Sequence, residues 1–560
     1  MRKKSFSNLF KKYANGWSVI LVLLTLLIGL PIYTLLFKLI SSEGSGEVWS
    51  HLVDTVLIDY VLNSVGLVIV VSALTLLIGV SAAWVVSTCD IPLRRHFEWV
   101  LILPLAIPTY IAAYTYAGIF DYTGPIQSFL RNNGWIGLEY IDIMNFWGIA
   151  IVMSLVLFPY VYVVARSSFI NQSATLLEAS RILGSGSWQT FFKVALPITR
   201  PAIIGGLSLV MMEVLNDYGA VKYYGVNTFT TGIFRAWFSL GDPAAAINLS
   251  AILMLFILLL ISAERWQRGS NMLDEGGHTS RPMQRYQLKG WKKLLAFMVC
   301  FTPLFLGFMA PVFQLFLWSA QTIHKVWNED FITLMTNSFS LALLSAFLCV
   351  SISLIILYAV RINSTSFFRF LSKMASLGYS IPGAVIAIGI MIPMLGLDKV
   401  IIDLWKQSFG TRIGLIFSGT LFALTFSYVV RFLTVAINPV DAAFKKFSNS
   451  MEEASHSLGA SSFKTLIKIN LPLIKSALLS GGILVFVDIL KELPLTLILR
   501  PFNFHTLATK AYELASDEMV AESATPSLII ILIGVIPIIV LNRLMKTQKK
   551  DGSIVDKKPK

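Results

Sequence analysis

Long apolar runs, separated by short polar connections, recur along the whole chain. A helix needs about 20 apolar residues to cross the ~30 Å hydrocarbon core of a bilayer. These runs are apolar on every side, whereas the strands of outer-membrane barrels alternate apolar and polar positions over about ten residues. The pattern therefore predicts an all-α membrane protein with about twelve spanning helices, at residues 17–40, 58–87, 97–119, 144–165, 197–221, 246–263, 294–318, 332–360, 370–394, 413–430, 473–499 and 526–542.

Composition supports a lipid environment. Of the 560 residues 56% are hydrophobic and only 14% are charged, so the apolar excess must face lipid. The net charge of +14 would suggest a nucleic-acid partner in a soluble protein, but here the basic residues stand in short connections and we expect none. The three cysteines, Cys89, Cys300 and Cys349, show neither a metal-ligand spacing nor a disulfide framework.

Lys and Arg are distributed asymmetrically between alternate connections. If the N-terminus is cytoplasmic, most of the 45 basic residues fall in cytoplasmic tails and loops, as the positive-inside rule requires. An even number of spans then places the C-terminus on the same side. The first apolar run is too long for the core of a signal peptide, so we expect no cleaved leader. We predict a multi-pass protein of the inner (cytoplasmic) membrane with both termini in the cytoplasm.

A segment of twenty residues occurs twice. EASRILGSGSWQTFFKVALP begins at Glu178, and EASHSLGASSFKTLIKINLP begins at Glu453, 275 positions later. Pro108 in the third run likewise matches Pro382 in the ninth. The halves are therefore six-span repeats of the same orientation. We predict repeats at residues 1–263 and 294–543, a cytoplasmic linker at 264–293 and a basic cytoplasmic tail at 544–560.

Each copy reads as a short cytoplasmic helix that needs a docking surface. Gly184 and Gly459 allow a turn that would strain other residues. Pro197 and Pro472 suit the first turn of the following span. The alternative is an ordinary basic loop between two spans. The residues that recur in register and define the two copies are Glu178, Ala179, Gly184, Leu196 and Pro197 in the first copy and Glu453, Ala454, Gly459, Leu471 and Pro472 in the second.

The two copies resemble the coupling-loop signature of ABC importer permeases, Glu-Ala-Ala followed by Gly and then Ile-x-Leu-Pro. Ser180 and Ser455 replace the second Ala, and Val194 replaces Ile in the first copy. The resemblance implies two type I (MetI-like) permease repeats, two separate ABC ATPase subunits that dock on these loops, and a periplasmic or extracellular substrate-binding protein. The chain has no GxxxxGK[ST] loop, so we expect a transport subunit that is not an enzyme and carries no cofactor.

Three longer stretches resemble the fused ferric-iron permeases. They are Leu103–Gln127, Met212–Phe238 and Asp488–Glu518. The resemblance implies ATP-driven import of ferric iron. Fused permeases for thiamine, polyamines and phosphonates are broadly similar, so these substrates remain open. A secondary transporter would also suit two parallel halves, but it would not explain the repeated coupling signature. No filter-like loop or catalytic pair favours a channel or an intramembrane enzyme.

Two acidic pairs stand at equivalent points of the repeats. Glu213 and Asp217 are four residues apart, as are Asp488 and Glu492, so each pair is predicted to share one helix face near the external end of its span. Charged groups at membrane depth commonly mark a pathway, and Fe(III) prefers carboxylate oxygen. We therefore treat these residues as transient metal contacts and predict no fixed metal site. The alternatives are helix capping, cross-linking or contact with the binding protein.

Two tyrosines of the third run complete the set of candidate residues. Tyr110 and Tyr114 stand on the predicted span and are candidates to line the translocation pathway. An aromatic stripe on a membrane helix is also typical of packing.

Overall fold

The computed structural model describes residues 16–40, 46–134, 141–171, 180, 184, 186–268, 285–363, 365–411, 413–448 and 450–554. Among these residues, nine helices are long and apolar enough to cross a membrane, and eleven spans result if two bent pairs each count as one. Ala524–Ile539 is a shorter apolar helix. The prediction of an all-α membrane protein is confirmed. Helices dominate at membrane depth because they satisfy their own backbone hydrogen bonds.

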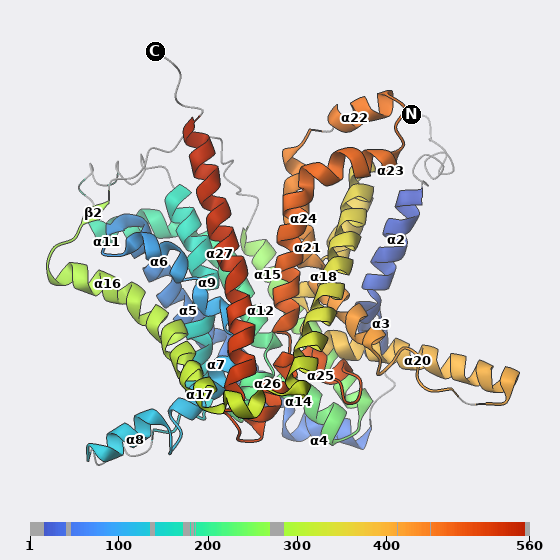
Figure 1. The fold of residues 1–560 in the computed structure, drawn as a ribbon, viewed down its shortest axis with the longest axis horizontal. Helices are drawn as coiled ribbons and strands as arrows, with labels where there is room; N and C mark the ends of the chain where they lie inside the picture. The colour runs from blue at the N-terminus through green and yellow to red at the C-terminus, as the bar shows by residue number, and fades with distance from the viewer. Residues whose placement is uncertain are drawn as a thin grey trace. The chain divides into compact units, whose positions relative to one another are not determined.

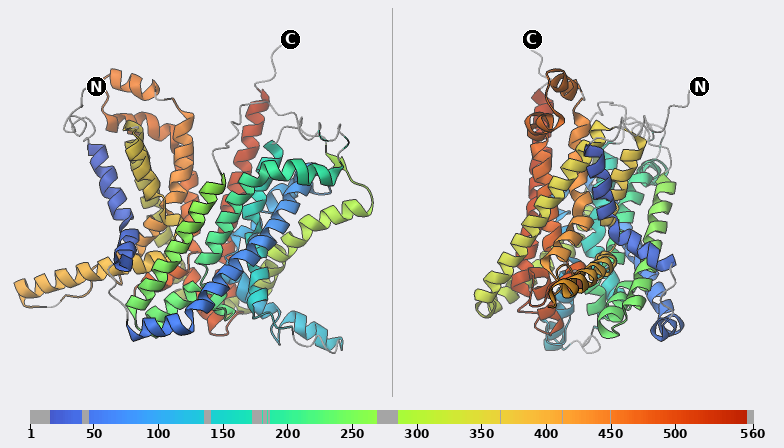
Figure 2. Two further views of the ribbon diagram at one scale, coloured as in Figure 1. Left: turned by 180° about the vertical axis from the view of Figure 1, so that it is seen from behind. Right: turned by 90° about the vertical axis from the view of Figure 1, so that its right-hand side faces the viewer.

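The chain forms two compact units. One combines residues 236–251 and 328–509 with the N-terminal segment up to Gly46. Within it, the first two helices pack on α18, α19 and α20, far away in sequence (Figures 1 and 2). Its elements are α2 (Gly16–Ile28), α3 (Leu30–Ile40), the start of α15 (Pro243–Arg268), α18 (Glu329–Ile362), α19 (Ser366–Ala375), α20 (Gly383–Phe409), α21 (Leu421–Lys446), α22 (Ser450–Ser457), α23 (Ser462–Thr465), α24 (Leu471–Leu490), α25 (Pro494–Leu499) and the start of α26 (Leu507–Ser516).

Specific side chains join α2 to its distant neighbours. The Trp17 ring meets Tyr358 edge to face at 5.0 Å between ring centroids. Asn363, at the end of α18, donates a hydrogen bond to the Ser18 hydroxyl at 3.0 Å. The N-terminal helix is therefore fixed to the second half of the sequence by both aromatic and polar contacts.

The other unit contains residues 47–235, 252–327 and 510–560. In it, α5 packs along α9, α12 packs on both, and α16 and α17, from later in the sequence, contact α5 and α7. Its elements are α4 (Glu47–Thr55), α5 (Leu57–Thr88), β1 (Cys89–Asp90), α6 (Arg94–Val100), α7 (Thr109–Ile119), α8 (Pro125–Asn132), α9 (Phe146–Asn171), α11 (Ser187–Thr190), α12 (Leu196–Asn216), α13 (Gly219–Tyr223), α14 (Phe229–Phe234), β2 (Tyr286–Gln287), α16 (Trp291–Leu304), α17 (Ala310–Val326) and α27 (Ala524–Ile554).

The compact units do not follow the order of the sequence repeats. Each unit contains most of one repeat together with the opening helices of the other. The end of the predicted linker also pairs with the first repeat, because β1 and β2 form a two-residue parallel ladder with Cys89 opposite Tyr286. The repeats at 1–263 and 294–543 are defined by similarity in sequence. The compact units are defined by which helices pack together, and their boundaries are different.

Two predicted spans are broken at the same dipeptide. The runs 97–119 and 370–394 were predicted to be continuous, and this is wrong: α7 begins after Ile107-Pro108 and α20 after Ile381-Pro382. Ile107 and Ile381 are extended, with ψ angles of 117° and 134°. Proline lacks an N–H donor and disfavours the helical conformation in the residue before it. In the first half the helical segments on either side of the break differ in direction by 89°.

Gly378 allows the connection between α19 and α20 to cross α21 closely. A Cβ atom at Gly378 would lie 1.9 Å from the carbonyl oxygen of Val430, which is fixed backbone. At Gly396, on exposed α20, nothing lies within 4 Å of the same position. The two glycines are therefore a matched pair for testing the fold.

We expect Gly378→Ala to destabilise the protein by about 1–3 kcal/mol, because the added methyl group displaces backbone. Gly396→Ala should be neutral or stabilising by up to about 1 kcal/mol, because alanine favours a helix. The apparent unfolding temperature of each purified variant in detergent measures the difference. Equal unfolding temperatures would contradict the close crossing.

Candidate functional site

The second copy of the repeated segment is a helix closed by a left-handed glycine. Helix α22 ends at Ser457, and Gly459 has a φ of 79°. The amide of Ala460 donates to the Ser455 carbonyl at 3.1 Å, and that of Gly459 donates to the His456 carbonyl at 2.9 Å. This pair of bonds is a Schellman motif, in which glycine is preferred because a Cβ atom would be strained. The predicted role of Gly459 as a turn residue is thus seen in the backbone.

In the first copy the matching glycine is also left-handed. Gly184 has a φ of 81° and is exposed. Glu178 and Ala179 lie outside the described residues. Leu196 and Pro197 begin α12, and Leu471 and Pro472 begin α24, each directly after a π-helical turn. The prolines were predicted in the first turn of the span, and this is wrong, because the continuous helix begins earlier, at Trp188 and at Ser462.

In each copy a serine hydroxyl and a threonine hydroxyl lie within hydrogen-bond distance of each other, a contact that the sequence analysis did not predict. Ser180 lies 3.2 Å from the hydroxyl of Thr190, and Ser455 lies 3.0 Å from that of Thr465. All four side chains are buried. Both serines depart from the Glu-Ala-Ala pattern of the family. The signal that could have found the pair is the threonine that recurs ten residues after each serine.

The outer surface of the segments is apolar. Leu458 is 89% exposed and Phe463 is 62% exposed, and at the position matching Phe463 the first copy presents Trp188, 76% exposed. Glu453 and Ala454 are also exposed. Large apolar side chains with so little intramolecular cover are typical of a surface that another protein covers.

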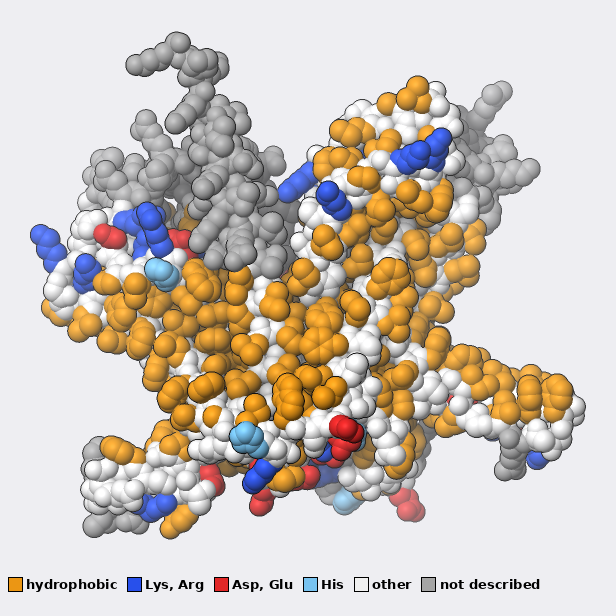
Figure 3. Space-filling model, viewed as in Figure 1, with side chains coloured by type: hydrophobic (Ala, Val, Ile, Leu, Met, Phe, Trp, Pro, Cys, Tyr) orange, Lys and Arg blue, Asp and Glu red, His pale blue; other side chains and the backbone are white. Residues whose placement is uncertain are grey.

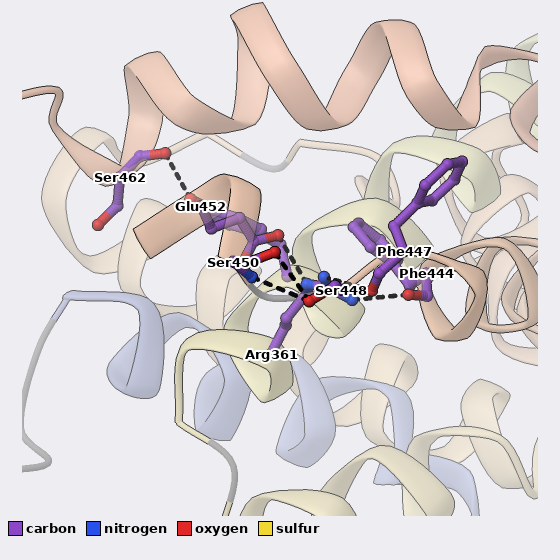
Figure 4. A network of polar contacts seen from close by, with 8 residues as sticks. Arg361, Phe444, Phe447, Ser448, Ser450, Glu452 and Ser462 are labelled. Carbon is purple, nitrogen blue, oxygen red and sulfur yellow. Dashed lines mark hydrogen bonds and ion pairs between the residues drawn. The ribbon is translucent and has the colours of Figure 1, made fainter. Parts of the chain in front are cut away.

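Arg361 holds α22 against the ends of two long helices (Figure 4). Its Nε donates to Glu452 at 2.6 Å, while its terminal nitrogens donate to the carbonyls of Phe444 at 2.7 Å and Phe447 at 3.0 Å. Both charged side chains are 12% exposed. A guanidinium group presents several donors in a fixed plane. Arg361 therefore ties the end of α18, the end of α21 and the start of the repeated segment together.

Each repeated segment continues directly into a long span. α11 and α12 are joined by one π-helical turn, and Trp188–Asn216 forms one apolar helix. α23 and α24 are joined in the same way in Ser462–Leu490. A continuous helix is stiff along its axis, so a displacement of the segment moves the near end of the span.

The four candidate carboxylates do not form two helix-face pairs. α12 ends at Asn216 and α24 at Leu490, so Asp217 and Glu492 stand beyond the helices, and the predicted spans 197–221 and 473–499 were too long. Asp217 has an extended backbone, with ψ 132°. The geometric argument for each pair was therefore wrong, because the chain turns at the second acid.

Asp217 is buried and caps the next helix. Its carboxylate accepts hydrogen bonds from the amides of Ala220 at 2.9 Å and Val221 at 3.3 Å. Thr109, the first residue of α7, also donates its hydroxyl to this carboxylate. Asp217 thus joins the break at the end of α12 to the break before α7.

Glu492 occupies the matching place in the other unit. It is 7% exposed and forms an ion pair with Arg431 at 3.3 Å, and it accepts from the amide of Leu495 at 3.2 Å. Arg431 also donates to the carbonyl of Ile381 at 2.9 Å, at the break before α20. Gly383 stands where the first half has Thr109, and a Cβ there would meet Glu492 at 2.5 Å. A side chain at this position would therefore displace the Glu492 carboxylate from where it pairs with Arg431.

Glu213 and Asp488 are only partly buried, one turn before the capping acids. Tyr160 donates to Glu213 at 3.4 Å. Lys491 pairs with Asp488 at 2.8 Å, with 31% and 18% of the side chains exposed. Among the described residues, no group of three His, Cys, Asp or Glu side chains is arranged to hold a metal ion. Of the four candidates, only these two retain surface for a passing solute.

The two tyrosines are packed inside their unit. Tyr110 is 5% exposed, and its ring meets Tyr512 nearly perpendicularly at 6.4 Å. Tyr114 is fully buried and shares a hydrogen bond with Ser527 of α27. These contacts place both rings in the packing between α7 and the C-terminal part of the unit.

Comparison with known proteins agrees with the repeated organisation. Residues 75–269 and 351–550 each match the family described as the binding-protein-dependent transport system inner membrane component. The chain is 25% identical over 530 residues to the Fe(3+)-transport system permease protein FbpB 2 of Haemophilus influenzae, covering 93% of this chain and 98% of that protein. It is 28% identical over 259 residues to the sulfate transport system permease protein CysT of Escherichia coli, covering 45% and 90%.

The two matched stretches include both copies of the repeated segment and the long helices that follow them. The chain therefore belongs to the family of inner membrane components of binding-protein-dependent transport systems and is a permease subunit of an ABC importer that carries the family's domain twice.

Proposed function

We propose that this permease imports ferric iron, driven by two ABC ATPase subunits that dock on the two repeated segments. The observation that carries the docking step is the exposure of the apolar side chains Trp188, Leu458 and Phe463, which lie at or just before the starts of two long helices. A substrate-binding protein delivers iron on the opposite face of the membrane. Both termini lie on the ATPase side, as the positive-inside distribution of Lys and Arg favours.

The continuous helices suggest how force reaches the membrane. When the ATPases close on ATP, they carry the turns at Gly184 and Gly459 with them. α12 and α24 follow, because α11 and α23, which come after these turns, each continue into the span as one helix. Their far ends carry Asp217 and Glu492, which are bonded to the breaks before α7 and α20. Movement at each coupling segment is thereby passed to one break in its own unit, before α7 in one unit and before α20 in the other, and hydrolysis reverses it.

The substrate assignment is supported by a relative and by charge. The relative that matches nearly the whole chain is named for Fe(3+) transport. The partly exposed carboxylates Glu213 and Asp488 offer hard oxygen ligands to a cation. Shorter relatives are named for sulfate, but carboxylates repel an oxyanion. Thiamine and polyamine remain as cationic alternatives, and phosphonate is an anionic alternative that the same repulsion disfavours.

Leu458→Ser tests the docking surface. We expect it to weaken binding of the ATPase subunit by about tenfold or more, because a hot-spot side chain contributes about 2 kcal/mol. The unfolding temperature should stay unchanged, since Leu458 makes little contact within the chain. Phe502→Ser is the matched control, because Phe502 is 94% exposed on the connection after α25. Binding to permease in nanodiscs is measured, and unchanged affinity in Leu458→Ser would exclude this docking surface.

Arg361→Gln tests the clamp on α22. The substitution removes the ion pair to Glu452 and leaves two helix-end carbonyls without their donor. We expect the ATPase to remain bound while iron transported per ATP hydrolysed falls several-fold in proteoliposomes. Glu452→Gln keeps the shape and both carbonyl contacts, so its effect should be smaller. Wild-type coupling in Arg361→Gln would show that the clamp has no role in transmission.

Neutralising the acids separately distinguishes pathway from structure. We expect Glu213→Gln and Asp488→Asn to lower radiolabelled ferric uptake at normal folded yield. Glu492→Gln should instead lower the yield and the unfolding temperature, because breaking a buried ion pair costs about 3–5 kcal/mol. Asp217→Asn should act in the same direction. Uptake is measured in cells lacking the native chain and normalised to folded protein.

If uptake is independent of the chain, iron is excluded, and thiamine, polyamine and phosphonate are tried next. If uptake needs the chain but tolerates Glu213→Gln with Asp488→Asn, iron import stands and the carboxylate pathway is excluded.

A further inference from the structure

The second half of helix α20 projects from the compact unit to which the helix belongs (Figure 1). Its first turns pack on α3, α21 and α25, with Gly389 against Pro31. Beyond Pro393 it extends away from its unit, and Figures 1 and 2 show it running across the direction of α18 and α24. From residue 395 to residue 410 only Asp398 is buried. The whole helix, Gly383–Phe409, is long and apolar enough for a span. Its projecting part nevertheless does not run parallel to α18 and α24 (Figure 1).

The projecting half of α20 is amphipathic. At 100° per residue, Leu397, Val400, Leu404, Trp405 and Phe409 fall on one broad arc, and all are exposed. The opposite arc carries Lys399, Asp403 and Lys406. Figure 3 shows hydrophobic side chains along the edge of this helix that faces the spans, with a basic side chain at its other edge. The apolar surface of the arm is continuous with that of the bundle.

Asp398, the charged residue within the apolar arc, is shielded from the surroundings by residues 416–418. Asp398 is fully buried, because residues 416–418 fold back over α20. Their three amides donate to its carboxylate at 3.1, 2.9 and 2.8 Å, and the Ser418 hydroxyl donates as well. A carboxylate on a helix in water needs no such cover, whereas in hydrocarbon every polar group must be paired. The covering loop itself presents Leu415 and Ile416 outward.

We propose that residues 394–418 form a lipid anchor that lies in the membrane–water interface, at the end of its unit opposite α22. The apolar arc enters the acyl chains of one leaflet, and Lys399 and Lys406 lie among the phosphate groups. Trp405 suits this depth, because an indole ring has an apolar body and a polar N–H. Its Nε1 already donates to the Thr411 hydroxyl at 3.1 Å. The anchor is independent of the substrate and of ATPase docking.

Spin labels on opposite arcs test the anchor. Leu404→Cys and Lys406→Cys are two residues apart but point in nearly opposite directions. The native cysteines are all buried, so wild type treated with the label gives the background. The full chain is reconstituted in vesicles of phosphatidylcholine and phosphatidylglycerol, and the accessibility of each label to oxygen and to a water-soluble nickel chelate is measured.

We expect the label at position 404 to be several-fold more accessible to oxygen than to nickel, and the label at 406 to show the reverse. Leu397→Cys and Lys399→Cys repeat the comparison seven residues earlier on the same two arcs. This second pair replaces the first if the variants at positions 404 and 406 fold poorly. Ready access of nickel to both arcs would overturn the anchor in favour of a helix in water. Protection of both arcs from nickel would overturn it in favour of a span.

Discussion

The requirement that each carboxylate and each broken helix end at membrane depth be paired organises both units. Hydrocarbon supplies no hydrogen bonds, so a break in a span is tolerated only where side chains replace the missing partners. Asp217 does this with two amides and Thr109, and Glu492 does it with Leu495 and Arg431. At equivalent places in the two repeats, a buried carboxylate is therefore paired in both cases. The partners differ, since a hydroxyl donates in the first repeat and a guanidinium forms an ion pair in the second.

This constraint explains what could and could not be predicted. The positions of most spans and the left-handed turn at Gly459 follow from local sequence, because they depend on apolar length and backbone freedom. The breaks at Ile107-Pro108 and Ile381-Pro382 were missed, because hydropathy records composition and not the direction of the chain. Proline in both runs was the available signal, and it had been used only to align the repeats.

The candidate acids show the same limit more sharply. Four-residue spacing implies one helix face only while the helix continues, and the helices end before Asp217 and Glu492. Which partner a buried carboxylate finds depends on distant residues such as Thr109 and Arg431, and no local pattern records that contact. The exchange of opening helices between compact units was invisible for the same reason, since it is decided by packing and not by the order of repeats.

Each coupling segment continues into a long helix, and the capping acids Asp217 and Glu492 stand just beyond the far ends of these two helices. Trp188–Asn216 and Ser462–Leu490 each span 29 residues, about 43 Å at 1.5 Å per residue. A substitution of Asp217 or Glu492 therefore changes the contacts that fix the end of α12 or α24, whether or not a cation binds to that residue. Loss of uptake alone cannot assign a carboxylate to the pathway. The folded yield of the same variant separates the two roles, because a pathway acid is dispensable for folding and a cap is not.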